Sequence, residues 1–451
     1  MTQPLAPYST LYAVAQTTPE LRSIYSAQAT VQAMLDVEAA LADAQAKIRL
    51  IPAAAARTIR RHCRAESFAI EDLANGARLA SNLAIPVVSA LTAKVAAASS
   101  ASARYVHWGA TSQDITDTAA VLQLRAALLA MDLDHKRLLA ALRRLARRHR
   151  RTVMTGRTLM QAAAPTTFGL KAASWLDALL RQQDRLDEAR HRCLVLQFGG
   201  AVGTLASLGS AGPAIARQMG RGLKLPVPDI PWHGARERFG EIATVLGLLV
   251  GALGKMARDI SLLAQSEVGE LAEPAAAGRG GSSTMPHKRN PVACAQVLAA
   301  AFRMPHLVAT MLSTQVQENE RALGGWHAEW TVLPEIVLLA GGALRHMTET
   351  IEGLEVDVRR MRQNLDARQG LPLAEAVAMA LAEQVGKKAA HDMIEHASHE
   401  AVRRGIHLRQ AIEADPRIAR HFSKALLDRV FDPGRYLGAS DAFIDAVLKR
   451  R

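Results

Sequence analysis

The chain is poor in aromatic residues and in cysteine, and each scarcity excludes a class of protein. Aromatic side chains are 4% of its 451 residues, and no basic patch is interleaved with them, so we expect no nucleic-acid partner. The three cysteines, Cys63, Cys193 and Cys294, are widely spaced and form no CxxC pair. This odd, scattered set argues for a reducing compartment and against a disulfide framework or structural zinc.

Long apolar runs, internal repeats and low-complexity linkers are also missing. No stretch approaches the roughly 20 apolar residues that a membrane span needs, so we expect no membrane association. Residues 1–16 lack the cationic start and long apolar run of a secretory signal. No spacing of His, Asp and Glu resembles a metal site. The sequence therefore predicts a soluble, cytoplasmic protein without a bound metal.

What is abundant is alanine, leucine and arginine. Hydrophobic residues are 49% of the chain, charged residues are 22%, and β-branched runs are scarce, which is typical of an all-α protein. Fifty-five Lys and Arg against 42 Asp and Glu give a net charge of +13. This excess fits either a polyanion-binding surface or attraction of small anionic substrates. Its densest run, within 143–151, has the pattern of a solvated helix face.

Apolar residues recur at three- and four-residue intervals, as in Leu246, Leu249, Leu253, Met256 and Ile260. Such spacing predicts long helices packed along their length in an elongated central five-helix bundle. The apolar stripes look broader than one chain can cover, so we expect an oligomer. Smaller helical domains at the two ends give a predicted division into 1–105, 106–355 and 356–451. The five long helices are expected over 119–150, 166–196, 241–265, 292–312 and 330–350.

Three polar loops interrupt the long helices and are where chemistry is expected. Residues 280–291 read GGSSTMPHKRNP, a permissive backbone whose N–H groups and side chains can surround an anion. Residues 107–118 place hydroxyls at a helix start, which suits a carboxylate ligand or an elaborate N-cap equally well. Residues 156–167 alone predict only a turn leading into a helix that is capped near Thr166.

Taken together, these loops resemble the three signature regions of the fumarase/aspartase superfamily. The matching patterns are HxGATSQD, GRTxxQ and GSSTMPHKRN, and the likeness to one branch of the family, the muconate cycloisomerases, runs from Leu21 to Ala439. The resemblance implies an all-α homotetramer with a twenty-helix core, in which each active site takes its three regions from three subunits. It implies elimination or addition beside the carboxylate of a small polycarboxylate substrate, with neither a metal nor an organic cofactor.

Residue roles follow from the resemblance. It implies that Ser282 is the general base and that Lys288 stabilises its alkoxide. His107 and His287 either touch substrate or hold a loop, whereas His233 and His327 are expected to be structural. The expected substrate-binding residues are His107, Thr111, Ser112, Thr158, Gln161, Ser283, Asn290 and Arg321.

Two departures from the wider superfamily bear on the leaving group. Many relatives have a histidine where this chain has Leu159, paired with a glutamate where it has Ala295. That histidine serves leaving groups that must be protonated to depart, whereas a carboxylate, with an acid pKa of about 4, leaves unaided. The chain looks most like the lactone-forming muconate cycloisomerases of aromatic-compound catabolism, although Ala162 and Asn319 depart from their pattern.

Three functions therefore stay open. The first is a cofactor-free cycloisomerase acting on a carboxymuconate. The second is a sister lyase that expels a weakly basic anion, such as nitrite or a carboxylate, from a substituted succinate. The third is a catalytically inactive helical scaffold or basic binding protein.

Overall fold

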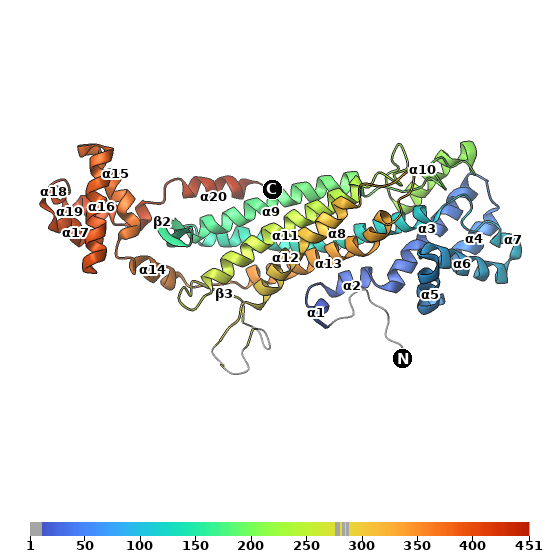
Figure 1. Cartoon of the computed structure of the whole chain (residues 1–451), viewed down its shortest axis with the longest axis horizontal. Helices are drawn as coiled ribbons and strands as arrows, with labels where there is room; N and C mark the ends of the chain where they lie inside the picture. The colour runs from blue at the N-terminus through green and yellow to red at the C-terminus, as the bar shows by residue number, and fades with distance from the viewer. Residues whose placement is uncertain (1–10, 276–279, 282–284, 286–287, 451) are drawn as a thin grey trace. The chain divides into compact units, whose positions relative to one another are not determined.

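The computed structural model describes residues 11–275, 280, 281, 285 and 288–450 (Figure 1). The chain divides into two compact units, each assembled from three segments. The first unit contains the chain up to His135, Gln182–Gly254 and Gln296–His346; the second contains Lys136–Arg181, Lys255–Ala295 and the chain from Met347 onward. Five long helices pass through both units, so each unit contains part of every long helix.

The elements are overwhelmingly helical. The five long helices are α8 (Ser112–Arg148), α9 (Phe168–Cys193), α11 (Glu237–Leu263), α12 (Val292–Ser313) and α13 (Gly325–Glu352). The earlier helices are α1 (Leu11–Val14), α2 (Pro19–Ile24), α3 (Ala27–Lys47), α4 (Ala53–His62), α5 (Ile70–Ala80), α6 (Ala84–Ala98) and α7 (Ser100–Ala103), and α10 (Gly212–Leu223) lies between α9 and α11. The later helices are α14 (Val358–Asp366), α15 (Ala374–Val385), α16 (Lys387–Arg404), α17 (Leu408–Ala414), α18 (Pro416–Ala419), α19 (Lys424–Val430) and α20 (Ser440–Lys449).

The long helices are held together by the apolar faces that the sequence predicts. Leu246, Leu249, Leu253, Met256 and Ile260 of α11 are at most 1% exposed. Ion pairs add contacts at the edges of the bundle. In the first unit they join α8 to α9, α9 to α11 and α12 to α13, and in the second unit they join α8 to α13. The predicted all-α class with five long helices is confirmed.

The first unit packs its N-terminal segment tightly onto α13. A Cβ atom added at Gly341 would lie 2.0 Å from Leu21 Cδ1, and one at Gly342 would lie 2.0 Å from the carbonyl oxygen of Gln16. Only glycine permits so close an approach at these two positions. Behind this contact, α3 packs against α4 and α10, and Ser26 caps α3 by accepting from the N–H of Ala29 at 3.2 Å.

The second unit contains an element that the sequence did not predict. Strands β1 (Val153–Thr158) and β2 (Gln161–Thr167) form an antiparallel hairpin, where we expected a turn and a helix starting near Thr166. The hairpin turns through Leu159 and Met160, both of which have positive φ, the geometry of a two-residue primed turn. Pro165 is tolerated because the sheet has only two strands. A second small sheet pairs β3 (Leu271–Ala272) with β4 (Glu355–Val356).

The C-terminal part of the second unit has a core of its own. Val377, Leu381, Ile394, Leu408 and Ile412 are buried together. Helices α15, α16, α17, α18 and α19, labelled in Figure 1, surround them. The three-part domain division expected from the sequence stays a prediction.

Helices α11 and α12 are more apolar along their length than we expected from the sequence. The most apolar 18-residue windows of α11 and α12 have mean hydropathies of 1.5 and 1.4, which is enough by length and composition for a membrane span. We expected no stretch with enough apolar residues for a membrane span, and by length and composition this expectation was wrong for α11 and α12. Buried core helices pass the same test, and the α11 window is 61% buried, whereas the α12 window is only 28% buried. Much of the apolar surface of α12 is therefore exposed in the single chain.

Candidate active site

The first signature loop is fixed by one buried carboxylate. Asp114, in the first turn of α8, is fully buried and accepts hydrogen bonds through both oxygens. Oδ1 accepts from the N–H of Gly199 at 2.8 Å, and Oδ2 accepts from those of Gly200 at 2.9 Å and Thr111 at 3.0 Å. His233 Nε2 lies 3.0 Å from Oδ1. Asp114 therefore ties the Thr111 loop to the backbone that follows α9.

Thr111 and Arg321 are brought together in the first unit. Arg321 Nη2 donates to Thr111 Oγ1 at 2.9 Å and to the carbonyl oxygen of Ala201 at 3.1 Å. No carboxylate among the residues that the structure describes forms an ion pair with this guanidinium, and its Nε is buried without a hydrogen-bond partner. Ser112 is the first residue of α8, beside Thr111. A cation, a hydroxyl and a helix N-terminus thus adjoin one another, an arrangement that suits a carboxylate.

His107 is occupied by a protein partner. Its Nδ1 lies 2.5 Å from Oε1 of Glu38, whose side chain is fully buried on α3. Burial alone would lower the pKa of His107, but hydrogen bonding to Glu38, the charge of Glu38 and the charge of Asp114 together raise it above its ordinary value. This contact gives His107 a role in holding the loop, and its predicted contact with substrate stays a prediction.

The His107–Glu38 pair is expected to make stability depend on pH. Because the pKa of His107 is higher in the folded than in the unfolded state, its contribution is fully present below the unfolded value of about 6.5 and is lost as pH rises through the raised folded value. We expect the loss of unfolding free energy in His107→Gln to be largest near pH 6 and to shrink at higher pH. Urea denaturation across that range measures it.

His399→Gln is the matched control, because His399 is exposed on α16. A His107→Gln deficit that stays constant from pH 6 to pH 9 would contradict the assignment of the raised pKa to this pair.

The second signature loop is the β1–β2 hairpin. Thr158 and Gln161 are paired across the turn and are exposed. The strand leading to Thr158 is anchored by Arg157, whose Nη2 and Nη1 donate to the two oxygens of buried Glu270 at 2.6 and 3.0 Å. Asn364 Nδ2 donates to the same carboxylate at 2.8 Å. The hairpin therefore presents Thr158 and Gln161 from a firmly held base, with Leu159 96% exposed between them.

The third signature loop is described only at its base. Its predicted residues Ser282, Ser283 and His287 lie outside the described residues. The N–H of Asn290 donates to the carbonyl oxygen of Gly280 at 2.9 Å, which closes the loop. Lys288 is exposed, and the neighbouring Arg289 forms a two-point contact with Glu355 at 2.8 Å for each bond. Lys288 and Asn290 therefore flank Arg289 at the end of the loop that its ion pair with Glu355 holds in place.

Sequence reasoning missed a buried charged cluster behind the Thr111 loop. Arg236 is 2% exposed, and its Nη1 donates to Asp117 at 2.6 Å, while its Nε donates to Glu329 at 3.1 Å. Trp326 Nε1 donates to Asp117 at 2.9 Å. The sequence gives one signal, the Glu329 that lies between two tryptophans, but nothing in it joins residues 117, 236 and 329.

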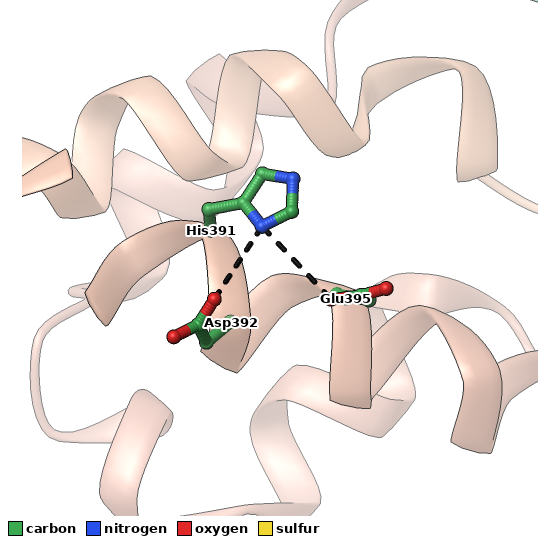
Figure 2. A group of neighbouring side chains, drawn as sticks. All are labelled: His391, Asp392 and Glu395. Atoms are coloured by element: carbon green, nitrogen blue, oxygen red, sulfur yellow. Dashed lines mark ion pairs between the residues drawn. The ribbon is translucent and has the colours of Figure 1, made fainter. Parts of the chain in front are cut away.

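Among the described residues outside these loops, one group of His, Asp and Glu side chains has its possible ligand atoms within 4.8 Å of one another. His391, Asp392 and Glu395 of α16 face one another (Figure 2), with His391 Nδ1 3.6 Å from Asp392 and 3.9 Å from Glu395. All three are more than half exposed, and Lys388 already pairs with Asp392 at 3.3 Å. The contacts are those of a surface ion-pair cluster. It contains none of the predicted site residues.

Comparison with known proteins gives the class to which this fold and these loops belong. A model described as lyase matches residues 13–305, and a model of the adenylosuccinate lyase C-terminus matches residues 370–447. The chain is 50% identical to a 3-carboxy-cis,cis-muconate cycloisomerase of Bradyrhizobium diazoefficiens, over 95% of each chain. It is 42% identical to a nitrosuccinate lyase of Streptomyces davaonensis, over 93% of this chain and 90% of that protein.

The solved structures agree. The crystal structure of the 3-carboxy-cis,cis-muconate lactonizing enzyme from Pseudomonas putida superimposes with a TM-score of 0.93 at 46% identity, covering 97% of this chain and 98% of the other. The all-α fold with five long helices and the match to the lyase model over residues 13–305 place the chain in the same class as these proteins. The chain belongs to the fumarase/aspartase superfamily.

Proposed function

We propose that the chain is a cofactor-free cycloisomerase that interconverts 3-carboxy-cis,cis-muconate and its γ-lactone. The relative at 50% identity carries this activity in its name, whereas the nitrosuccinate lyase is more distant at 42%. Because the substrate carries three carboxylates, its site must supply several cations and N–H donors. The predicted cytoplasmic location and the setting in aromatic-compound catabolism remain part of this proposal.

The main structural support for the proposal is that Arg321 forms no ion pair with a carboxylate among the described residues. Arginines that are buried in protein are usually paired with a carboxylate, and half-buried Arg321, whose Nε is buried, pairs with none of the described carboxylates. It is instead positioned by Thr111 and by the carbonyl oxygen of Ala201. A guanidinium held in place without its counter-charge is prepared for a carboxylate of the substrate.

The proposed chemistry is a single addition with one proton transfer. One substrate carboxylate oxygen adds to an alkene carbon, the π electrons move onto the carbon beside a second carboxylate, and the Ser282 hydroxyl protonates that carbon. In reverse, the Ser282 alkoxide removes the α-proton and the lactone carbon–oxygen bond breaks. Lys288 and Asn290 stabilise the alkoxide and the doubly charged intermediate, and Ser283 donates to the same substrate. Thr158 and Gln161 position another carboxylate.

A carboxylate leaving group accounts for the presence of Leu159 and Ala295 where many relatives have a histidine and a glutamate. Leu159, at the hairpin tip, and Ala295, in the first turn of α12, have hydrocarbon side chains, so neither position supplies a proton donor. A carboxylate leaving group needs none, because it departs as a weakly basic anion. The pair Leu159 and Ala295 therefore favours lactone chemistry over the loss of ammonia or hydroxide.

The test is direct incubation of the protein with 3-carboxy-cis,cis-muconate, following the loss of conjugated-diene absorbance. We expect turnover without any added metal or coenzyme. A parallel incubation with nitrosuccinate measures nitrite. Nitrite release without loss of diene would replace the proposal with the sister lyase, and no reaction with either compound would favour an inactive scaffold.

We also propose that the active form is a homotetramer whose sites are shared between three subunits. The support is the exposed apolar face of α12, where Phe302 is 66% exposed and Leu312 is 46% exposed. Burying such a face against other copies of the chain removes apolar surface from water, at about 25 cal/mol for each Å². The assembly should have about four times the 48.5 kDa mass of one chain.

Phe302→Asp is expected to break this assembly. A charge placed on the α12 face cannot be desolvated without a partner, so the mass measured by light scattering should fall below that of a tetramer and activity should fall with it. The matched control is Phe443→Asp on α20, where the phenylalanine is 60% exposed. If Phe302→Asp keeps the mass of four chains, α12 is not the tetramer face.

A further inference from the structure

Trp326 belongs to the buried charged cluster behind the Thr111 loop and also lies beside the candidate site. The guanidinium of Arg321 stands over its ring, with Cζ 5.9 Å from the ring centroid. A cation within about 6 Å of a tryptophan face is attracted by the negative charge of that face. Between the two residues the chain turns at Gly324, whose φ of +98° is one that other residues rarely adopt. The ring is therefore a third contact for Arg321, after Thr111 and Ala201.

The ring of Trp326 is itself held in a fixed orientation. Its Nε1 donates to Asp117 Oδ1 at 2.9 Å, and it meets the ring of Trp330 edge to face, with centroids 4.9 Å apart. Trp326 is 2% exposed. A buried ring that is packed on its neighbours and hydrogen-bonded at one edge has little freedom to change its side-chain rotamer. The guanidinium of Arg321 therefore lies against a surface of fixed orientation.

The buried cluster determines where the Trp326 N–H points. Arg236 donates to both oxygens of Asp117, at 2.6 and 3.1 Å, so the acceptor of the indole bond is held from two sides. The bond between Trp326 and Asp117 joins residues 209 positions apart, and the bond between Arg321 and Thr111 joins residues 210 positions apart. Two contacts therefore connect the segment before and at the start of α13 to the segment before and at the start of α8.

We propose that Trp326 is a positioning residue for Arg321 and that it affects the substrate only through that cation. This role rests on the proposed binding of a substrate carboxylate by Arg321. The two hydrogen bonds that described residues accept from Arg321 both come from Nη2, which leaves Nη1 for the substrate. A ring beneath the guanidinium limits its rotation about Nη2 and so fixes the direction in which Nη1 points. Recognition of a carboxylate by a guanidinium depends on that direction.

The test is a double-mutant cycle between positions 326 and 321 in the full-length protein. The measured quantity is the affinity for propane-1,2,3-tricarboxylate, by calorimetry or, where binding is millimolar, by NMR titration. We expect Trp326→Leu to weaken binding about tenfold, and Trp326→Phe, which keeps a smaller ring without the N–H, about threefold. In an Arg321→Gln background the same two substitutions should each change the affinity by less than about twofold, because the group through which they act is gone.

A ring that only supports the fold would lower the affinity by the same factor in both backgrounds, and that result would overturn the proposal. If Trp326→Leu fails to fold, the cycle with Trp326→Phe decides by itself. No tricarboxylate binding by the wild-type protein would overturn the proposal together with the role of Arg321. Loss of diene absorbance tests the cycloisomerase activity separately, so the two failures are distinguishable.

The matched control is Trp175→Phe in the second unit. Trp175 is 3% exposed, and its Nε1 donates to a carboxylate oxygen of Asp259 at 2.9 Å, so the substitution removes the same kind of bond from a ring that is equally buried. It should leave the affinity for the tricarboxylate within about twofold of wild type. An equal loss of affinity in Trp175→Phe and Trp326→Phe would also overturn the proposal.

Discussion

Replacing Ser282 by alanine is expected to lower kcat for lactone opening by about 10³-fold, the usual contribution of a positioned general base. The substitution removes the atom that takes the α-proton and leaves the carboxylate-binding groups, Thr111 and Arg321 among them, intact. Because the interaction is made only in the transition state, kcat and kcat/KM should fall by the same factor. Steady-state kinetics on the purified variant measure both constants.

The matched control is Ser313→Ala, a serine at the end of α12 whose hydroxyl donates within its own helix to the carbonyl oxygen of Ala309 at 2.9 Å. It should keep wild-type kinetics. A Ser282→Ala enzyme with near-normal kcat would mean that another group removes the proton.

The second large effect is expected from Asp114→Asn. The carboxylate accepts from the N–H groups of Thr111, Gly199 and Gly200 and contacts His233, and an amide can serve only part of this set. Hydrogen bonds to a buried charge are worth about 1.5–3 kcal/mol each, so we expect a loss of about 3 kcal/mol in unfolding free energy. Because the same oxygens place Thr111 beside Arg321, KM for the polycarboxylate should also rise.

Asp366→Asn is the matched control, because Asp366 forms an exposed pair with Arg362 within α14. Such surface pairs contribute little, so stability and KM should be close to wild type. If Asp114→Asn unfolds at the wild-type urea concentration, the buried carboxylate is not the anchor of the loop.

The long helices were predictable because the spacing of apolar residues along each segment is enough to specify a helix and its buried face. Along α11 the three-four spacing of Leu246, Leu249 and Leu253 specifies which face is buried, and the structure buries that face. The β1–β2 hairpin was not predictable in the same way. Ala162, Ala163 and Ala164 favour helix by intrinsic propensity, and the turn places Leu159 and Met160 at positive φ where glycine or asparagine is the usual signal. Pairing between the strands overrides both preferences.

In the candidate site, too, residues within the sequence motifs were predictable, whereas contacts between residues far apart in the sequence were not. Motif reading placed Thr111 and Arg321 in one site, and the hydrogen bond between them joins residues 210 positions apart. The anchoring role of Asp114 was not foreseen, since it depends on two acceptor bonds to the backbone N–H groups of Gly199 and Gly200, 85 and 86 positions away, which carry no side-chain signature. The partner of His107 was likewise hidden, because Glu38 lies in what reads as an ordinary amphipathic helix.

The most direct test of the proposed mechanism is a crystal structure of the tetramer with the lactone bound. We predict that the Ser282 hydroxyl lies within about 3.5 Å of the carbon beside a lactone carboxylate, the distance of a reactive contact. Thr111 and Thr158 from two other subunits should bind the carboxylates of the same molecule. A lactone seated with its α-carbon far from Ser282, or held by the loops of a single subunit, would contradict the proposal.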